Sequence, residues 1–249
     1  MNSESWNEMK DIERQKLEKR AFFCKEAQQI AKRTMDYARK IIKPGMPLPK
    51  LRESCEAEMR RLGADSFWYW DIGAFVFSGN ETAVSISGKD YKTADKIISW
   101  NDIITIDLSP QINGFWGDYA RTIIIENGTV IDEHKTNLLE WRAGIDMEDH
   151  LHCMLMEYAK PETCFEELYL YFNNVILENG FMNCDFLGNL GHSIEEKMEE
   201  RIYIENGNTK RLGEVVCFTF EPHICVPGSE YGFKKEDIYF FQSGRLAKL

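Results

Sequence analysis

Five side chains that commonly bind metal ions stand in strand-like contexts, and two of them are aspartates close together in the chain. Asp107 lies in the apolar run 103–108, and Asp118 lies in the returning run 115–125. A buried carboxylate is costly unless a cation or hydrogen bonds compensate its charge. Two carboxylates held close repel each other, and a divalent cation between them removes that repulsion. The alternative is that Asp107 pairs with Arg121 and that Asp118 lies at the edge of a turn.

The other three candidates lie in the second half of the chain. His192 follows Gly191, Glu221 follows the apolar run 215–220, and Glu236 precedes the aromatic segment 239–241. Taken singly, His192 could be a hydrogen-bonded core histidine, Glu221 a carboxylate bonded to a neighbouring strand, and Glu236 a surface residue. Taken with the aspartates, they make one imidazole and four carboxylates. Such an oxygen-rich set suits Mn, Fe, Co or Zn in a site with one or two divalent ions.

A β-hairpin is the element that must position the two aspartates. The runs 103–108 and 115–125 are rich in β-branched and aromatic residues, which favours strands. Pro110 and the Asn113-Gly114 pair provide the turn chemistry between them. Pairing of the two strands is therefore expected to bring the two carboxylates together.

The order of the remaining elements repeats along the chain. In the first half, helices are predicted over 4–42 and 47–62, and strand material over 66–87. In the second half, helices are predicted over 133–159 and 164–179, and strands over 186–194, 215–224 and 239–241. No Gly-, Ser- or Pro-rich linker separates the halves. We therefore predict a single domain, 1–249, of two similar αβ halves, about 10–126 and 127–249, around a shared sheet.

Composition excludes several classes of protein. Of the 249 residues 43% are hydrophobic, which disfavours a disordered chain. The net charge of −11 disfavours binding to nucleic acid and to an anionic membrane surface. No run is long enough to span a bilayer, and the polar N-terminus does not resemble a signal peptide. Seven scattered cysteines without a CxxC pair indicate reduced thiols. We therefore expect a cytoplasmic protein.

The ligand-type residues resemble those of a known superfamily. Asp107, Asp118, His192, Glu221 and Glu236, in the contexts ITIDLS, GDYART, GH, TFEP and KKED, are similar to the five ligands of the "pita-bread" metallopeptidases. That superfamily includes methionine aminopeptidases, aminopeptidase P, prolidase and creatinase. The phrases IIKPGMPLPKL and FVFSGNETAV also resemble these enzymes, and the similarity extends from about residue 18 to the end.

The resemblance implies an α+β pita-bread fold, with two pseudo-symmetric halves around a curved, mostly antiparallel sheet. The short interval between Glu221 and Glu236 is closest to the prolidase and aminopeptidase P branch. The N-terminal domain of those longer enzymes is expected to be absent.

The resemblance also implies a role for each ligand. Asp107 would bind one metal ion, Asp118 and Glu236 would bridge two, and His192 and Glu221 would complete the site. The cofactors would be two divalent ions, Mn, Fe or Co, with Zn as a further candidate. Glu221 would also be catalytic, taking a proton from a bridging water that becomes the attacking hydroxide.

Two histidines of the family's peptidases are missing. Glu199 stands where one is expected after the metal-binding histidine, in GHSIEEKMEE, and Ile86 stands where the other is expected. Glu199 and Ile86 are both expected at the substrate-binding side of the site. Loss of a donor that stabilises an oxyanion costs about 3 to 4 kcal/mol in other hydrolases. His223, on the same side of a strand as Glu221, could supply a catalytic donor, with packing or support of a ligand as the alternative.

Five further residues receive structural predictions. Arg121 is expected to support a ligand carboxylate from behind rather than to bind substrate. Trp68 or Trp70 could line the substrate pocket, although core packing is the simpler explanation. His150 and His152, two apart on a predicted helix, are expected at the surface.

The function predicted from these residues is that of a dinuclear metal-dependent hydrolase, which cleaves an amide or peptide bond of a small substrate in the manner of an Xaa-Pro peptidase. One alternative is a different reaction on a non-peptide small molecule, either creatinase-like C–N hydrolysis or di-iron oxygen chemistry. The other is a binding protein without catalysis. The expected partner is a small peptide or other small molecule. Neither nucleic acid nor a membrane is expected as a partner, and both a monomer and a homodimer stay open.

Overall fold

A computed structural model describes the backbone of residues 3–249 and the side chains of residue 20 and residues 22–249. The first half contains helices α1 (Ser3–Ile41) and α2 (Leu48–Arg61) and a 3-10 turn η1 (Gly79–Ala83), with strands β1 (Ser66–Phe67), β2 (Ala74–Ser78), β3 (Asp102–Leu108), β4 (Pro110–Ile112), β5 (Phe115–Trp116), β6 (Tyr119–Glu126) and β7 (Thr129–Val130).

The second half repeats the order of two helices and then strands. After the 3-10 turn η2 (Glu133–Lys135) it contains α3 (Leu139–Tyr158), α4 (Phe165–Glu178), β8 (Met182–Asn183), the 3-10 turns η3 (Met198–Glu200) and η4 (Leu212–Glu214), β9 (Phe218–Phe220), β10 (His223–Cys225), β11 (Gly232–Lys234), β12 (Asp237–Gln242) and β13 (Arg245–Lys248).

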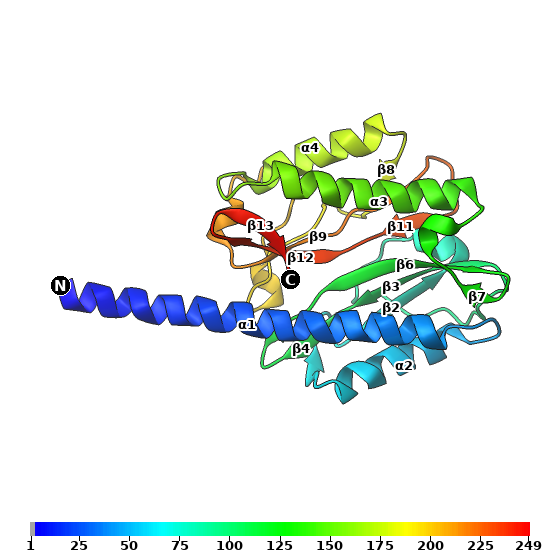
Figure 1. Cartoon of the computed structure of the whole chain (residues 1–249), viewed down its shortest axis with the longest axis horizontal. Helices are drawn as coiled ribbons and strands as arrows, with labels where there is room; N and C mark the ends of the chain where they lie inside the picture. The colour runs from blue at the N-terminus through cyan, green and yellow to red at the C-terminus, as the bar shows by residue number, and fades with distance from the viewer. Residues whose placement is uncertain (1–2) are drawn as a thin grey trace.

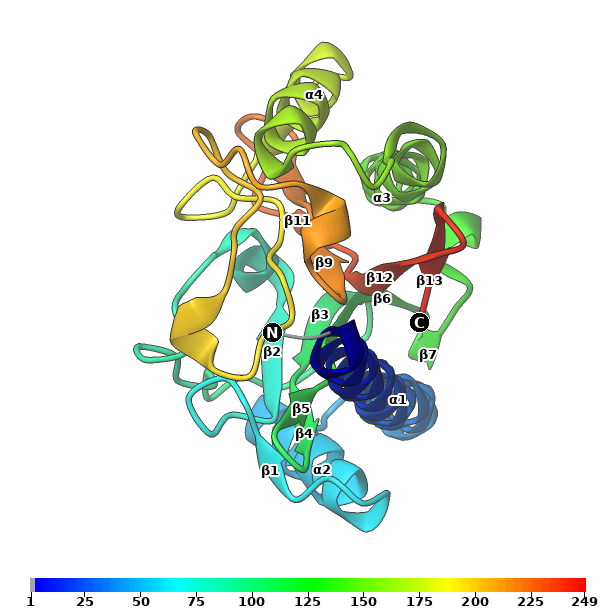
Figure 2. The ribbon, with the colours of Figure 1, turned by 90° about the vertical axis from the view of Figure 1, so that its left-hand side faces the viewer.

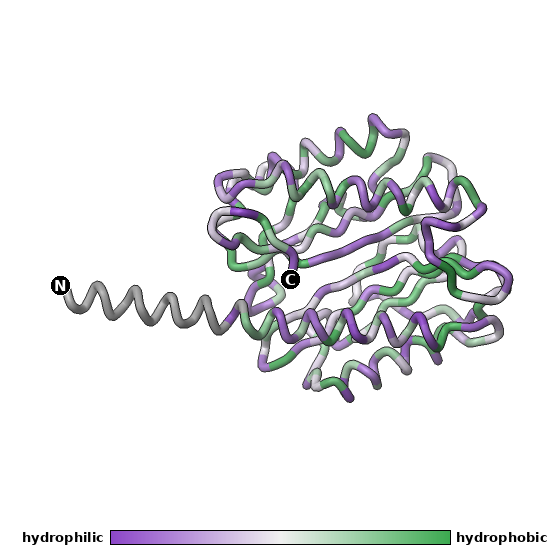
Figure 3. Tube along the Cα trace, in the orientation of Figure 1, coloured by the Kyte–Doolittle hydropathy of each residue, from purple (hydrophilic) through white to green (hydrophobic). Residues whose placement is uncertain are grey.

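The strands lie between two pairs of helices. The first half forms a sheet of order β2-β3-β6-β7, and the second forms β11-β10-β8 and β13-β12-β9, with antiparallel neighbours throughout. Helices α1 and α2 cover one side of these strands, and α3 and α4 cover the other (Figures 1 and 2). The apolar segments follow the strands and the inner faces of the helices (Figure 3). The predicted α+β class is confirmed.

Alternation along β3 decides which side chains reach the middle of the molecule. Ile104, Ile106 and Leu108 pack in the core under α1 and α2, whereas Ile103 belongs to the core of the second half. Because successive side chains of a strand point to opposite faces, Asp107 shares the face of Ile103. The carboxylate therefore points toward the second half of the chain.

The two halves meet where β6 runs beside the segment from β11 to β12. The Glu236 amide donates to the Ala120 carbonyl oxygen at 3.0 Å, and the Lys234 amide donates to the Thr122 Oγ1 at 2.9 Å. An isolated bridge also pairs Arg121 with Lys235. These bonds fix residues of both halves at the centre of the molecule, while the predicted division near residue 126 stays a prediction.

The predicted pairing of the two runs is confirmed, although the returning run 115–125 is divided into β5 and β6, with Asp118 between them, and Pro110 lies in β4 rather than in a turn. Strand β3 pairs with β6 from Asp102 opposite Ile125 to Leu108 opposite Tyr119. Between them, β4 and β5 form a short ribbon whose turn residues, Asn113 and Gly114, both have positive φ, as the Asn-Gly pair requires. The helices also agree with prediction, except that α3 starts at Leu139, after a 3-10 turn.

Three further predicted strands are wrong in extent. The segment 66–87 contains only the strands β1 and β2, followed by the 3-10 turn η1. The segment 186–194 contains no strand and makes only isolated bridges, such as His192 to Tyr203, because Gly188 and Gly191 adopt positive φ angles that break an extended run. The predicted strand 215–224 is divided into β9 and β10 at Glu221-Pro222, since proline cannot donate to a strand ladder. In the described part of the chain, no helix combines the length and apolar character needed to cross a membrane.

Candidate metal centre

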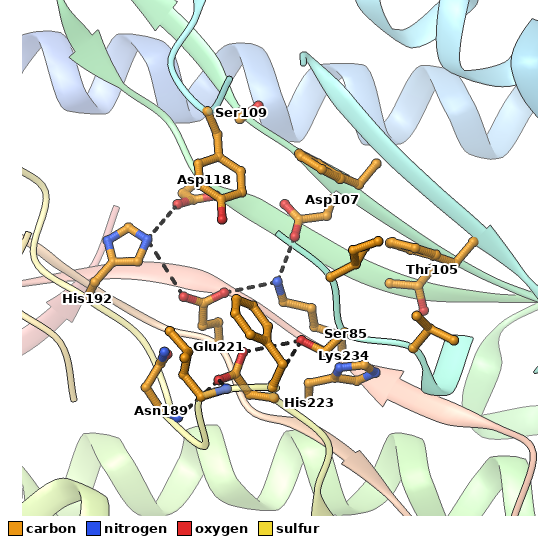
Figure 4. A pocket seen from close by; sticks show the side chains of 18 of the residues that line it. Ser85, Thr105, Asp107, Ser109, Asp118, Asn189, His192, Glu221, His223 and Lys234 are labelled. Carbon is orange, nitrogen blue, oxygen red and sulfur yellow. Dashed lines mark hydrogen bonds and ion pairs between the residues drawn. The ribbon is translucent and has the colours of Figure 1, made fainter. Parts of the chain in front are cut away.

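A cavity of about 130 Å³ lies between the two halves and is walled by both. The side chains of Asp107, Asp118, His192, Glu221 and Lys234 converge on it (Figure 4). Its remaining wall is mixed: aromatic rings such as Trp68, Tyr69 and Tyr203 stand beside polar and charged side chains such as Asp185 and Arg201. The cavity therefore offers both apolar and polar contacts to a small ligand.

The hairpin register brings the two aspartates together as predicted. Asp107 lies opposite Ala120, and Asp118 precedes Ala120 by two residues on the same face. The Asp118 backbone is clamped by Gln28 of α1, whose amide donates to the Asp118 carbonyl and accepts from its N–H, both at 2.8 Å. Asp107 pairs with Lys234 rather than Arg121, so the alternative pairing for Asp107 is wrong.

His192 is placed by a glycine and a threonine. Gly191 has φ +140°, and a Cβ there would lie 2.3 Å from the Thr219 carbonyl oxygen, so only glycine permits this close approach. The His192 amide donates to Thr219 Oγ1 at 3.0 Å. His192 Nδ1 lies 2.9 Å from the Ser193 carbonyl oxygen, which can only accept, so Nδ1 carries the proton. Nε2 therefore faces the cavity, 3.5 Å from Asp118 Oδ2, and a neutral ring would present its lone pair there to a metal ion.

Three of the five candidate ligands form a compact buried group. One ligand atom each of Asp118, His192 and Glu236 lie within 4.8 Å of one another. Glu236 is fully buried, and neither of its carboxylate oxygens has a hydrogen-bond partner. Burial, with Asp118 and Glu221 nearby, raises the pKa of Glu236 well above its usual value. Burial raises the pKa of Asp118 to about 6, against the lowering effect of His192.

Glu221 lies at the end of β9, at the edge of this group. Its Oε1 is 3.7 Å from His192 Nε2 and 3.4 Å from Thr219 Oγ1. Although burial raises the pKa of Glu221, the Lys234 ammonium and His192 lower it by more, so that the pKa lies below its usual value. Glu221 is therefore a charged acceptor at neutral pH.

Lys234 is a member of the site that sequence reasoning missed. Its Nζ lies 2.6 Å from Asp107 Oδ2, 2.9 Å from Glu221 Oε2 and 3.8 Å from Glu236 Oε2. Lys234 precedes Glu236 by two residues, a spacing that places two side chains on one face of an extended segment. That spacing within KKED was the available signal.

The proposed supporting residues have different roles. Trp68 lines the cavity, stands edge-on to the His192 ring at 5.5 Å and donates its indole N–H to the Gly117 carbonyl. Arg121 binds the Asp237 carboxylate at 2.9 and 3.0 Å and the Glu236 carbonyl oxygen at 2.7 Å. The carboxylate that it supports thus belongs to Asp237, next to the candidate ligand, and not to a ligand itself.

The remaining predicted site residues are divided between the cavity and the surface. His223 lines the cavity, is buried, and donates from Nε2 to the Thr82 carbonyl oxygen at 2.6 Å. Burial lowers the pKa of His223 to about 4, so the ring is neutral at pH 7. Ile86 also lines the cavity, whereas Trp70 and Glu199 are exposed and do not line it. The prediction of substrate contacts for Trp70 and Glu199 is not supported by this placement.

The donor set fits a divalent cation. A buried carboxylate whose two oxygens lack hydrogen bonds is costly, and beside Glu236 lie the His192 imidazole nitrogen and a second buried carboxylate. A cation held by Asp118, His192 and Glu236 would satisfy all three groups with the hard oxygen and nitrogen donors that Mn, Fe, Co and Zn accept.

Comparisons with known proteins agree with this geometry. The chain matches metallopeptidase family M24 over residues 23–242. It is 30% identical over 128 residues to an Xaa-Pro dipeptidase of Lactobacillus helveticus, a match that covers 51% of this chain and 32% of that protein. It is 25% identical over 195 residues to a methionine aminopeptidase of Helicobacter pylori, covering 74% of this chain and 71% of the relative. The chain thus aligns with about a third of the length of the dipeptidase.

Solved structures share the fold. A prolidase from Pyrococcus horikoshii has a TM-score of 0.78 at 22% identity, covering 93% of this chain and 61% of that one. A methionine aminopeptidase from Thermotoga maritima has a TM-score of 0.74 at 14% identity, covering 92% and 96%. The expected pita-bread architecture is therefore confirmed, and the match over most of its length shows that the chain belongs to metallopeptidase family M24.

Proposed function

We propose that this protein is a metal-dependent hydrolase that cleaves an amide or peptide bond of a small substrate, in the manner of an Xaa-Pro peptidase. The observation that carries the proposal is the buried group of Asp118, His192 and Glu236 beside a cavity, with His192 Nε2 facing inward. Family membership and the similarity to a protein named Xaa-Pro dipeptidase support it.

A bound divalent ion would lower the pKa of a coordinated water and polarise a substrate carbonyl. Glu221 is the residue that this chain offers as general base, because it is charged, lies at the cavity and stands 3.7 Å from His192. Neutral His223 would contribute a hydrogen bond from the cavity wall rather than a charge.

The cavity wall supports a small substrate with an apolar part and an anionic part. The Arg201 guanidinium lines the cavity and lies 5.1 to 5.2 Å from the ring centres of Trp68, Tyr69 and Tyr203. A guanidinium held over aromatic rings is positioned to bind a carboxylate. Arg201 is therefore our candidate for the group that binds the carboxylate of a short peptide.

The test is turnover by the full-length protein loaded separately with Mn, Co, Fe or Zn, on matched Xaa-Pro and Xaa-Ala dipeptides followed by mass spectrometry. Release of the free amino acids is expected, and Asp118→Asn and His192→Gln should abolish it. Asp95→Asn is the control, since Asp95 is exposed and lies outside the cavity. Full metal loading without cleavage of either dipeptide would contradict peptide hydrolysis.

A second candidate function is supported by the positions of Ile86 and Glu199. Ile86 places an aliphatic group at the cavity, and Glu199 lies outside it, so neither supplies the donor expected of the family's peptidases. We therefore retain a reaction on a non-peptide small molecule, with either creatinase-like C–N hydrolysis or di-iron oxygen chemistry. Creatine hydrolysis by the Mn-loaded protein, or oxygen uptake after anaerobic Fe loading, would identify these reactions.

The alternative of a non-catalytic binding protein makes a different prediction. A protein purified without added metal should then contain none and take none up on titration. The cytoplasmic location and the homodimer stay predictions from the sequence.

A further inference from the structure

The candidate ligands divide into two parts, and a cation of the protein itself already satisfies one of them. On one side, the Lys234 ammonium lies 2.6 Å from Asp107 and 2.9 Å from Glu221. On the other side, among the described residues, no side-chain cation lies within hydrogen-bond distance of Asp118 and Glu236: the Lys234 ammonium is 3.8 Å from Glu236 Oε2, and neither Glu236 oxygen has a hydrogen-bond partner. Figure 4 shows the ammonium between Asp107 and Glu221, with His192 and Asp118 beyond.

The backbone of β11 directs Lys234 into the site. Its amide donates to Thr122 Oγ1 at 2.9 Å, and Lys234 lies opposite His223 in the β10–β11 ladder. The next residue, Lys235, forms an ion pair with Asp149 instead, as alternation along an extended segment requires. The register that orients Glu236 thus orients Lys234 as well, and only a change in that register would turn the whole side chain away.

A second metal ion would compete with the ammonium for its ligands. That ion would have to bind Asp107 and Glu221, the carboxylates that hold the Lys234 ammonium, in a buried place where like charges repel strongly.

We propose that the Lys234 ammonium occupies one of the two cation positions implied by the resemblance, so that the chain binds a single divalent ion, held by Asp118, His192 and Glu236. This inference rests on the proposed metal-dependent function but goes beyond it. Lys234 is a positioning residue here, because it fixes Asp107 and Glu221 without an exchangeable ion.

The test is the stoichiometry of Mn²⁺ on the full-length protein, made metal-free by chelation and then titrated, with elemental analysis and electron paramagnetic resonance as readouts. The wild type should bind one equivalent and give the spectrum of an isolated ion. Lys234→Met, similar in length but neutral, should bind two equivalents and give the signal of an exchange-coupled pair. Lys235→Met is the matched control and should bind one.

The outcomes separate this inference from the proposed function. Two equivalents in the wild type would overturn the inference and leave a metal-dependent hydrolase intact, whereas no binding would overturn both. One equivalent in a folded Lys234→Met protein would show that lysine does not exclude the second ion, and would also overturn it. Should Lys234→Met fail to fold, Lys234→Gln replaces it, and the wild-type count alone still decides the number of ions.

Discussion

His152 should make the stability of this protein fall steeply in mild acid. The ring is buried, and it bonds on both sides: Nδ1 lies 2.6 Å from Tyr239 Oη, and Nε2 lies 3.0 Å from the Lys235 carbonyl oxygen. The carbonyl can only accept, so Nε2 carries the proton and Nδ1 accepts from the tyrosine. A second proton would remove that acceptor. The ring supports the chain at Lys235, between Lys234 and Glu236 of the candidate site.

The size of the effect follows from the pKa of His152. Burial lowers it from 6.5 to about 3, although Asp237 opposes this. Between these values the unfolded chain binds a proton that the folded chain does not, so stability increases with pH and is complete above the unfolded pKa. Between pH 7 and pH 5 the folded state should lose about 2 kcal/mol through this one group.

The assay is urea unfolding of wild type and His152→Gln at pH 5, 6 and 7, well buffered and without metal. The variant is less stable at pH 7, but the difference from wild type should shrink by about 2 kcal/mol on going to pH 5. His150→Asn, an exposed neighbour on the same helix, is the control and should leave the wild-type dependence unchanged. Parallel pH curves for wild type and His152→Gln would refute the assignment of a neutral, buried ring.

Three further changes test other parts of the structure. Gly191→Ala should weaken Mn²⁺ binding by about 10- to 100-fold, because the new Cβ would displace His192 from Thr219. Gly207→Ala is the control, since Gly207 also has a positive φ but a Cβ there would lie in open space. Equal Mn²⁺ affinities of the two variants would contradict the proposed displacement of His192. Glu148→Gln should stabilise the protein by about 1 to 3 kcal/mol at pH 8 in thermal unfolding, because both oxygens of buried Glu148 lack partners. Burial raises the pKa of Glu148, so wild-type stability falls as pH rises above 4.5. The stability gained by Glu148→Gln should therefore vanish near pH 4.5. A gain that does not depend on pH would show that it does not come from the buried charge of Glu148. Arg201→Gln should raise KM for a dipeptide by about 10- to 100-fold with little change in kcat, as expected when a contact equally strong in the ground state and the transition state is lost. Arg245→Gln, at an exposed position, is the control and should leave KM unchanged. An unchanged KM in Arg201→Gln would contradict the proposed contact with the substrate carboxylate.

The hairpin and its two aspartates could be predicted because the information is local. Side-chain alternation and the Asn113-Gly114 turn together fix the register, and the register places Asp107 and Asp118 on one face. The helices were predictable for the same reason, since their periodicity and their stops at Pro or Gly lie within the segment itself.

The rest of the site depends on approaches between distant segments. The segment around His192 was predicted as a strand, but it is held instead by bridges to Tyr203 and by Thr219. Spacing along a helix placed His152 at the surface, whereas the packing of α3 against the sheet buries it. Arg121 was assigned to a ligand carboxylate, and its partner proved to be Asp237, on a strand from the other half.

Which residues could bind a metal ion was predictable without coordinates, because residue type and strand periodicity are properties of short segments. How these ligands are shared is apparent only in the folded chain. The junction of β6 with β11 brings the Lys234 ammonium between Asp107 and Glu221 and leaves Glu236 without a hydrogen-bond partner. Charge compensation depends on distances between side chains far apart in the chain, and those distances exist only once both halves have packed together.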